Sequence, residues 1–193
     1  EPDVFYHLGV AYHLNYRFFE AIVQYEKYMK LNAAAAKKRE VERHVQMCKN
    51  GMLLLGNIKD LYVLDKKEVN DRDYYRSYND MGFGGRFVIK PEEFKLKADK
   101  KIVNDILFIS DMNQVMVFSS YGDGKSGNKD IFMSRRLPTG GWGTPENIGS
   151  PVNTTYDEDY PFLLPDGKTL FFSSKGHNSM GGYDIFKSYF NDE

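Results

Sequence analysis

The feature that most constrains this chain is an internal repeat with a period of 54 residues. Residues 102–136 align with residues 156–190 without a gap, and 11 of these 35 positions are identical. The matches include Phe-Ser-Ser at 118–120 and 172–174, and Asp-Ile-Phe at 130–132 and 184–186. Composition alone does not produce identities in one fixed register. The second half of the chain therefore contains two copies of one structural unit.

Aromatic and β-branched runs separated by turn residues predict strands inside each copy. The Asp166-Gly167 turn is expected to join the first two strands of the later copy. In the earlier copy a further strand follows, which has no counterpart before the end of the sequence. The expected strands are 160–164, 168–174 and 183–189 in the later copy, and 130–136 and 142–148 in the earlier one.

A repeat of this length, built from strands and hairpin turns, is typical of β-propeller blades rather than helical solenoids. Closed propellers have at least about four blades, and only two copies are present. The missing strand of the later copy would follow Tyr189, and the sequence ends at Glu193. We therefore expect an incomplete propeller with an open sheet edge, belonging to a longer protein.

The first quarter of the chain has a helical pattern. Residues 3–50 contain one glycine and no proline, and their apolar residues recur at steps of three and four. This spacing predicts two antiparallel helices joined at 15–17, and a third helix from Ala33 that stops at Gly51. The apolar stripe of the third helix is Val41, Val45, Cys48 and Met52. We expect Cys48 to be a core residue rather than a catalytic thiol.

These patterns predict an α+β multidomain protein with three segments. Residues 1–52 form a helical domain, and residues 80–193 form the repeat-containing β domain. Sixteen of the 17 glycines follow residue 50, which marks the change of class. Residues 53–79 show no clean period and are interpreted as a linker or degenerate strand region, with 61–64 as a candidate strand.

Charge and composition exclude several classes of protein. Lys and Arg number 26 and Asp and Glu number 27, so the net charge is −1, without the basic excess of a general nucleic-acid binder. The longest apolar run, near 51–56, is far shorter than the roughly 18–20 residues of a membrane span. The single cysteine excludes an intramolecular disulfide framework.

Residues with catalytic or metal-binding chemistry are sparse. The four histidines are scattered, and no His-Glu-x-x-His motif is present. Ser179 resembles the serine of a nucleophile elbow only weakly, because His177 replaces the first glycine and a strand follows instead of a helix. The acidic stretch at 123–130 lacks the alternating oxygen ligands of an EF-hand loop, and the stretch at 157–159 precedes a strand, where acidic side chains are expected to face water. We therefore predict no catalytic, cofactor-binding or metal-ligating residue, and no enzyme activity.

The first helical pair resembles a tetratricopeptide repeat. The matching positions are Phe5, Leu8, Gly9, Tyr12, Ala21 and Tyr25. Tyr28 and Ala33 depart from the pattern, which has a small residue and a proline at these places. The resemblance implies a close helix approach at Gly9 and further helices outside this sequence. It also implies a concave face for a protein partner, formed by Tyr6, Val10 and His13.

The β domain resembles the WD40-like repeats of TolB-type propellers. The signature covers 161–174 and 181–186, and the blade junction corresponds to 142–149 and 151–153. Helical repeats followed by such a propeller resemble PorE-like envelope proteins of the Bacteroidetes. Those proteins continue into an OmpA-like peptidoglycan-binding domain and are associated with type IX secretion.

The combined resemblance implies a non-enzymatic scaffold or adaptor of a cell-envelope complex. It implies protein partners among outer-membrane or secretion proteins, and a periplasmic location at the outer membrane, with a lipid anchor as one means of attachment. Peptidoglycan binding would belong to a domain outside this chain, and neither a cofactor nor nucleic acid is implied.

Two other functions remain open from the sequence. The first is the non-catalytic propeller of a prolyl-oligopeptidase-like hydrolase, which requires a catalytic domain outside these residues. The second is a propeller lectin or ligand sensor. Trp142 is the single tryptophan, so the sequence offers few residues for an aromatic sugar-binding platform.

Overall fold

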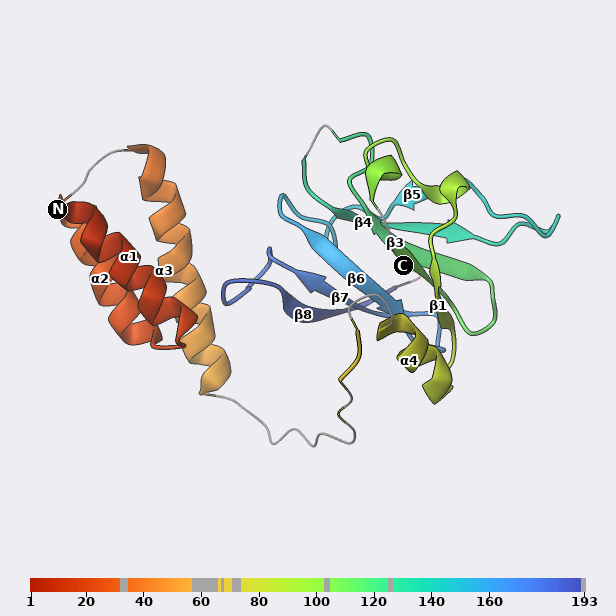
Figure 1. Cartoon of the computed structure of the whole chain (residues 1–193), viewed down its shortest axis with the longest axis horizontal. Coiled ribbons are helices and arrows are strands. Elements are labelled where there is room, and N and C mark those ends of the chain that lie inside the picture. The colour runs from red at the N-terminus through yellow and green to blue at the C-terminus, as the bar shows by residue number, and fades with distance from the viewer. Residues whose placement is uncertain are drawn as a thin grey trace. The chain divides into compact units, whose positions relative to one another are not determined.

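The computed structural model describes residues 1–31, 35–56, 66, 68–70, 74–102, 105–124 and 127–191. It shows an α+β chain in which N-terminal helices are followed by two open antiparallel sheets (Figure 1). Two compact units are present: Glu1–Val63 with Asn178–Asp184, and Leu64–His177 with Ile185–Glu193. Among the described helices, none has the length and apolar character needed to cross a membrane.

The first unit begins with two antiparallel helices, α1 (Pro2–Leu14) and α2 (Phe18–Leu31), joined at the turn that the sequence predicts. The helices approach closely at Gly9, where a Cβ atom would lie 2.6 Å from the ring of Tyr25. That ring is fully buried, so it has no space in which to move aside. The close approach expected at Gly9 is confirmed.

The third helix, α3 (Ala35–Leu55), continues past the stop that the sequence predicts at Gly51. Gly51 instead lies against α2, and a Cβ atom at this position would come within 2.5 Å of the Phe18 ring. The packing of a large ring on a glycine outweighs the cost of about 1 kcal/mol that glycine carries inside a helix. Of the predicted stripe, Val41, Val45 and Cys48 are buried, whereas Met52 is exposed.

The second unit begins with a helix that the sequence pattern did not predict, α4 (Tyr74–Met81). Its Tyr78 ring packs edge-on against Phe87 of strand β1 (Arg86–Ile89). The Asn79 side chain accepts from the Phe87 N–H and donates to the Phe87 carbonyl, both at 2.8 Å. These bonds occupy backbone groups at the edge of the sheet, where unpaired groups are a liability. The candidate strand at 61–64 lies outside the described residues.

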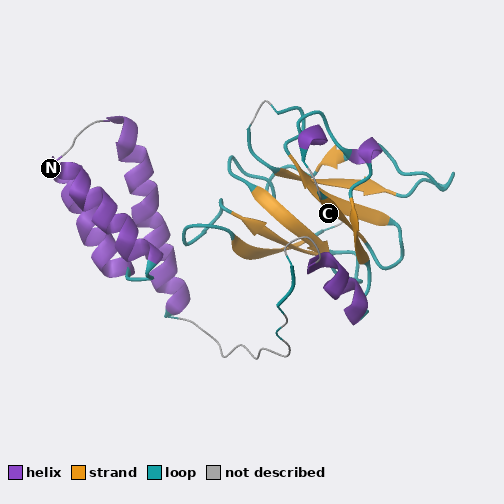
Figure 2. Ribbon diagram, in the orientation of Figure 1, coloured by secondary structure: helices purple, strands orange, loops and turns teal. Residues whose placement is uncertain are grey.

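Two sheets make up the rest of this unit (Figure 2). The first has the order β1-β2-β3-β4-β5 and the second has the order β6-β7-β8. Hydrogen-bonded neighbours in the first sheet are antiparallel, as are β6 and β7. The bounds are β2 Ile106–Ile109, β3 Val115–Ser120, β4 Asp130–Arg135, β5 Glu146–Asn147, β6 Glu158–Leu163, β7 Thr169–Ser174 and β8 Asp184–Tyr189.

The sheets follow the sequence repeat closely. Strands β3 and β7 are related by 54 residues at both ends, and so are β4 and β8. The strand predicted at 142–148 is shorter than expected: β5 spans Glu146–Asn147, and Trp142 forms an isolated bridge with Arg136. Pro145 lies between them and has no N–H to donate to the ladder, which explains the interruption.

Two apolar cores lie on the two faces of the first sheet. One face contributes Phe108, Val117 and Ile131, which pack with Leu170 and Phe172 of the second sheet. The other face carries a separate cluster that includes Met116, Phe118 and Phe132. Phe94 of the 3₁₀ helix η1 (Glu92–Phe94), Leu96 and Trp142 pack against this second cluster. The first sheet is therefore covered on both faces.

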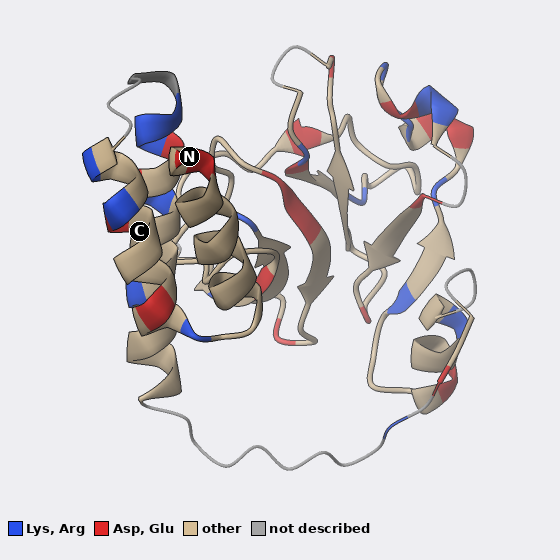
Figure 3. Cartoon of the chain, turned by 60° about the vertical axis from the view of Figure 1, so that its left-hand side comes forward, with Lys and Arg blue, Asp and Glu red and all other residues tan. Residues whose placement is uncertain are grey.

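Charged residues of both signs are interspersed over the molecule. Figure 3 shows acidic and basic positions on the helices and on the strands. This distribution agrees with the net charge of −1.

Candidate functional site

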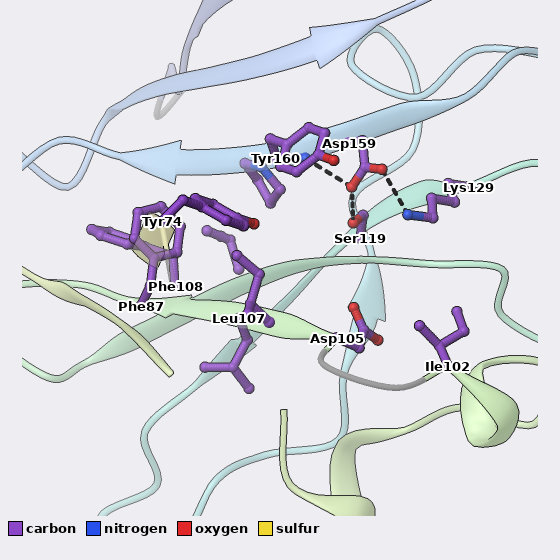
Figure 4. Close-up of a pocket in the computed structure, with 13 residues that line it drawn as sticks. Tyr74, Phe87, Ile102, Asp105, Leu107, Phe108, Ser119, Lys129, Asp159 and Tyr160 are labelled. Atoms are coloured by element: carbon purple, nitrogen blue, oxygen red, sulfur yellow. Dashed lines mark hydrogen bonds and ion pairs between the residues drawn. The ribbon is translucent and has the colours of Figure 1, made fainter. Parts of the chain in front are cut away.

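A cavity of about 300 Å³ lies within the second unit, lined by residues of α4 and of both sheets. Its aromatic wall is formed by Tyr74, Phe87 and Phe108 (Figure 4). Four polar side chains lie on the opposite side: Asp105, Ser119, Lys129 and Asp159. The cavity therefore combines an apolar wall with a compact group of charges.

Asp159, in β6, links the two sheets through polar contacts. Its carboxylate accepts a hydrogen bond from the Ser119 hydroxyl of β3 and lies 2.6 Å from Lys129 Nζ. Burial acts to lower the pKa of Lys129, but the hydrogen bond and charge of Asp159 outweigh burial and raise this pKa above its ordinary value. The lysine is thus held in its charged form against Asp159.

A second lysine, Lys90, has a completely buried side chain. Its Nζ donates to the Ser119 carbonyl at 2.8 Å, lies 3.5 Å from Asp99 Oδ2 and forms an ion pair with Asp105. It also lies 4.5 Å from the centroid of the Phe118 ring. A buried ammonium group is tolerated only when it is paired in this way.

Asp105 and Asp159 occupy equivalent positions in the two copies of the repeat, yet they bind different partners. Burial raises the pKa of Asp105, and the ion pair with Lys90 opposes the rise. Asp105 Oδ2 forms an ion pair with Lys90, but it is buried and has no hydrogen-bond partner among the described residues. Asp105 is therefore less well satisfied than Asp159.

The chemistry of this cavity is that of an ion-pair network. Ser119 has a carboxylate as its hydrogen-bond partner, and no hydrogen bond among the described residues joins a serine or cysteine side chain to a histidine. The arrangement thus lacks the nucleophile and base pair that acyl transfer requires. It can hold the two sheets in one fixed register, because its carboxylate and hydroxyl groups come from different sheets.

The predicted partner-binding residues, Tyr6, Val10 and His13, lie on one side of α1 and are all half-buried. Tyr6 and Val10 pack on the helical core, and the Tyr6 hydroxyl donates to Glu40 Oε1 of α3 at 2.6 Å. Burial, together with this hydrogen bond, raises the pKa of Tyr6 to about 12. The three side chains therefore lie on the same side of α1, and each has part of its surface covered by packing within the unit.

His13 has two polar neighbours inside the first unit. Its Nδ1 lies 3.5 Å from the Tyr25 hydroxyl oxygen, and its Nε2 lies 2.6 Å from the carbonyl oxygen of Met180, which belongs to the same unit. The ring centroids of His13 and His44 are 6.0 Å apart. His13 is thus positioned by contacts within the unit, and its role in partner binding stays a prediction.

The other candidate residues have structural roles. Cys48 is fully buried, and burial raises the pKa of its thiol to about 11, which agrees with the core position expected. Ser179 Oγ donates to the Gly182 carbonyl, while His177 Nε2 lies 3.0 Å from the Val152 carbonyl. In the described part of the chain, no group of three or more His, Cys, Asp or Glu residues could hold a metal ion.

The acidic side chains of 157–159 do not face water as the sequence suggested: Glu158 and Asp159 are buried, and all three bind other groups of this chain. Asp157 pairs with Lys175, and burial, which acts to raise its pKa, is outweighed by the hydrogen bonds from Lys175 and the Lys129 N–H, so this pKa is lowered. Glu158 is fully buried and accepts from Ser174 Oγ at 2.6 Å. These bonds favour a structural role for the stretch.

Sequence reasoning missed Tyr74 and Lys129 as members of the cavity, and Lys90 as the buried ion-pair partner of Asp105. The available signal was the recurrence of Asp105 at Asp159, which marks a position that both sheets use. Nothing in the local sequence around Lys90 distinguishes it from a solvated lysine.

Comparison with models of known protein families, with curated proteins and with solved structures finds no match to this chain. Its function therefore has to be inferred from its own geometry and sequence motifs.

Proposed function

We propose that this chain is part of a non-enzymatic scaffold that binds protein partners in a bacterial cell envelope. The observation that carries the proposal is the stacking of two equivalent sheets on one another in the second unit. Such stacking builds a rigid surface whose loops and edges are available to partners.

The stacking repeats a single packing operation. Ile131, on one face of the first sheet, packs with Leu170 and Phe172 of the second sheet. The 54-residue repeat relates Leu170 and Phe172 to Met116 and Phe118, which lie on the opposite face of the first sheet. The sheets are thus related front to back, as neighbouring blades of a propeller are, rather than by a two-fold axis. This supports the assignment of both sheets as WD40-like blades.

The first sheet is the starting blade of this stack in our proposal. Phe94 and Leu96 already cover its free face. The face that stays uncovered lies on the β6–β8 side.

The tetratricopeptide assignment of α1 and α2 is supported by their packing. Gly9 contacts Tyr25 at the position where the repeat motif requires a small residue. A third helix, α3, contributes Val41 and Cys48 to the same core, as the next helix of a helical array does. In this proposal, Tyr6, Val10 and His13 contact a protein partner along α1.

The location follows from the resemblance to PorE-like envelope proteins. We place the protein in the periplasm, associated with the outer membrane and with type IX secretion. Its partners are outer-membrane or secretion proteins, and peptidoglycan is bound through a domain outside this chain.

The proposal is tested by tagging the protein in its own bacterium and purifying it from the envelope fraction after mild cross-linking. Mass spectrometry should find outer-membrane or secretion proteins at near-stoichiometric amounts. Purification without such partners, or with a covalently continuous hydrolase domain, contradicts the proposal.

The helical surface is tested with a matched pair of variants on α1. Val10→Ala lies on the proposed partner side, whereas Val4→Ala changes a residue that is 58% exposed and six positions away, on a different side of the helix. We expect Val10→Ala to lose partners and Val4→Ala to keep them, with both variants folded by circular dichroism. Equal retention of partners contradicts the role of this side of α1.

A further inference from the structure

The outer face of the β6–β8 sheet exposes an apolar surface in a regular strand. Along β8, burial alternates so that Ile185, Lys187 and Tyr189 face outward together. Ile185 is 78% exposed and Tyr189 is 61% exposed. An isoleucine and a tyrosine exposed to this degree on one strand face are the mark of an interaction surface.

The corresponding face of the first sheet shows what covers such a surface. Ile131 corresponds to Ile185 through the 54-residue repeat, and Ile131 is 0% exposed. Val117, the counterpart of Phe171, is 2% exposed. Both are covered by Leu170 and by the other apolar residues of the following sheet. One chain therefore contains equivalent faces in a covered and an uncovered state, with Lys187 of β8 at the position where Met133 of β4 packs on the core.

We infer that the outer face of the β6–β8 sheet is the docking surface for one further sheet of the same repeat. This inference rests on the blade assignment in the proposed function, and it names the surface and its occupant. The incoming sheet presents the face equivalent to Leu170 and Phe172, and Ile185 becomes the centre of the new core.

The occupant is a further repeat rather than a second copy of this chain. A second copy has two faces of the kind that covers Ile131, and its own exposed β6–β8 outer face presents Ile185 and Lys187 instead of that kind. In its first sheet the face with Met116 and Phe118 is covered by Phe94 and Leu96, and in its second sheet the equivalent face is packed against the first sheet. Neither face is accessible in the folded chain.

A polar contact should fix the register of the new sheet. Ser119 donates to Asp159 of the following sheet, and Ser173 is the counterpart of Ser119. The incoming sheet should place an acidic residue, equivalent to Asp159, against Ser173. The residues that precede this acid should pair with β8, as β5 pairs with β4 through Phe132 and Asn147.

The test extends the full chain by one repeat of its own sequence. A copy of residues 137–191 is appended after Phe190, which keeps the period of 54. The probe is therefore the chain's own repeat unit, and the readouts are the urea midpoint and amide hydrogen exchange of β8. We expect a folded monomer in which exchange of the β8 amides slows at least about tenfold, because the strand gains both an edge partner and a covered face.

Two substitutions make the result specific. Ile185→Asp should leave the urea midpoint of the parent chain unchanged, since the side chain is exposed, and should abolish the added protection in the extended chain. Met112→Asp, at a residue that is 76% exposed in a turn of the first sheet, is the matched control and should affect the parent and the extended chain equally, leaving the added protection of β8 in place.

The inference is overturned if the appended repeat stays unfolded. It is also overturned if Ile185→Asp does not change the exchange of the β8 amides in the extended chain. Concentration-dependent dimers of the parent chain that Ile185→Asp removes would overturn the choice of occupant. Envelope partners captured by a chain that fails these tests would leave the scaffold proposal intact. Conversely, a docked repeat without envelope partners would support the surface and contradict the scaffold.

Discussion

The two sheets carry related sequences but have different surroundings. Ile131 and Ile185 occupy one register position, 54 residues apart, and their exposed fractions are 0% and 78%. Residue type cannot account for this difference, because the two residues are identical. Burial in a stacked repeat is decided by the neighbouring unit, so each repeat completes its core only through the next one.

The two sheets also satisfy the same polar group with different residues. Ser120 donates to Asp99 at 2.5 Å, while its counterpart Ser174 donates to Glu158 at 2.6 Å. In each sheet a glycine N–H two residues later donates to the serine hydroxyl. Asp99 belongs to the 3₁₀ helix η2 (Asp99–Lys101), which lies outside the repeat. The segment between β1 and β2 thus supplies to the first sheet a contact that the repeat itself supplies to the second.

The largest expected effect separates Ile131 from Ile185. Ile131→Asp buries a carboxylate without a partner between the sheets and should destabilise the second unit by about 4 kcal/mol or more. Ile185→Asp should stay within about 0.5 kcal/mol of the parent, because its side chain remains in water. Urea unfolding followed by the fluorescence of Trp142, the single tryptophan, measures both. Equal losses would mean that the two faces are covered alike in solution.

The next effect compares the two buried carboxylates that accept from these serines, Asp99 and Glu158. Asp99→Ala leaves the Ser120 hydroxyl without its acceptor and weakens the pairing of the buried Lys90, so we expect a loss of about 3–5 kcal/mol. Glu158→Ala removes hydrogen-bond acceptors from Thr154 and Ser174 but leaves no buried cation, so a loss of about 2–3 kcal/mol is expected. The same urea titration measures the loss of stability in each variant.

A conservative variant tests whether the charge of Asp99 causes the difference. Asp99→Asn keeps an oxygen acceptor for Ser120 and removes the charge beside Lys90. Its free energy of unfolding should fall between that of the parent and that of Asp99→Ala. An asparagine variant as stable as the parent would show that Lys90 relies on Asp105 alone.

A smaller effect concerns the residues that cover the first sheet. Leu96 is half-buried against the cluster around Phe118, so Leu96→Ala should cost about 1–2 kcal/mol. It should also increase the binding of a hydrophobic dye, because it opens a face comparable to that of β8. Leu137→Ala, at a residue that is 44% exposed, is the control and should leave dye binding unchanged. Equal dye binding by the two variants contradicts a covering role for Leu96.

The sequence predicted the elements whose signals are local or repeated. Strands β4, β7 and β8 begin and end within one residue of the expected positions, and β6 within two, because turn residues and the 54-residue register bound them. The helical hairpin was equally predictable from its apolar spacing. The interrupted fourth strand was not, since the effect of Pro145 on the ladder appears only once a partner strand is known.

The remaining features depend on contacts between distant residues. Helix α4 contains tyrosine, serine, asparagine and aspartate, which are poor helix formers, and it is held by Tyr78 and Asn79 against β1. Gly51 has the appearance of a helix stop until Phe18 is placed against it. Lys90 is an unremarkable lysine in the sequence, and its burial follows only from the positions of Asp99 and Asp105.

The smallest expected effect distinguishes the two hairpin turns and depends on pH. Asp166 accepts hydrogen bonds from the Thr169 hydroxyl at 2.5 Å and from the Thr169 and Lys168 N–H groups, and these bonds lower its pKa. In the first sheet the equivalent N–H, of Val115, donates to Ser110 Oγ instead, so that turn has no such carboxylate. A lowered carboxyl pKa stabilises the fold above the unfolded pKa, and the contribution is lost as pH falls through the folded value.

Asp166→Ala should therefore lower the urea midpoint slightly at pH 7, and the difference from the parent should shrink as the pH falls below the ordinary aspartate pKa of about 3.9 toward the lowered folded-state pKa. Met112→Asp places a carboxylate at the matching position of the other turn. This variant should raise the urea midpoint by less than Asp166 contributes in its own turn, because Val115 lacks a hydroxyl and its N–H already has an acceptor. Parallel urea titrations at pH 7 and pH 3 measure both variants. A midpoint difference for Asp166→Ala that is as large at pH 3 as at pH 7 would assign the effect to turn geometry rather than to the ionised carboxylate.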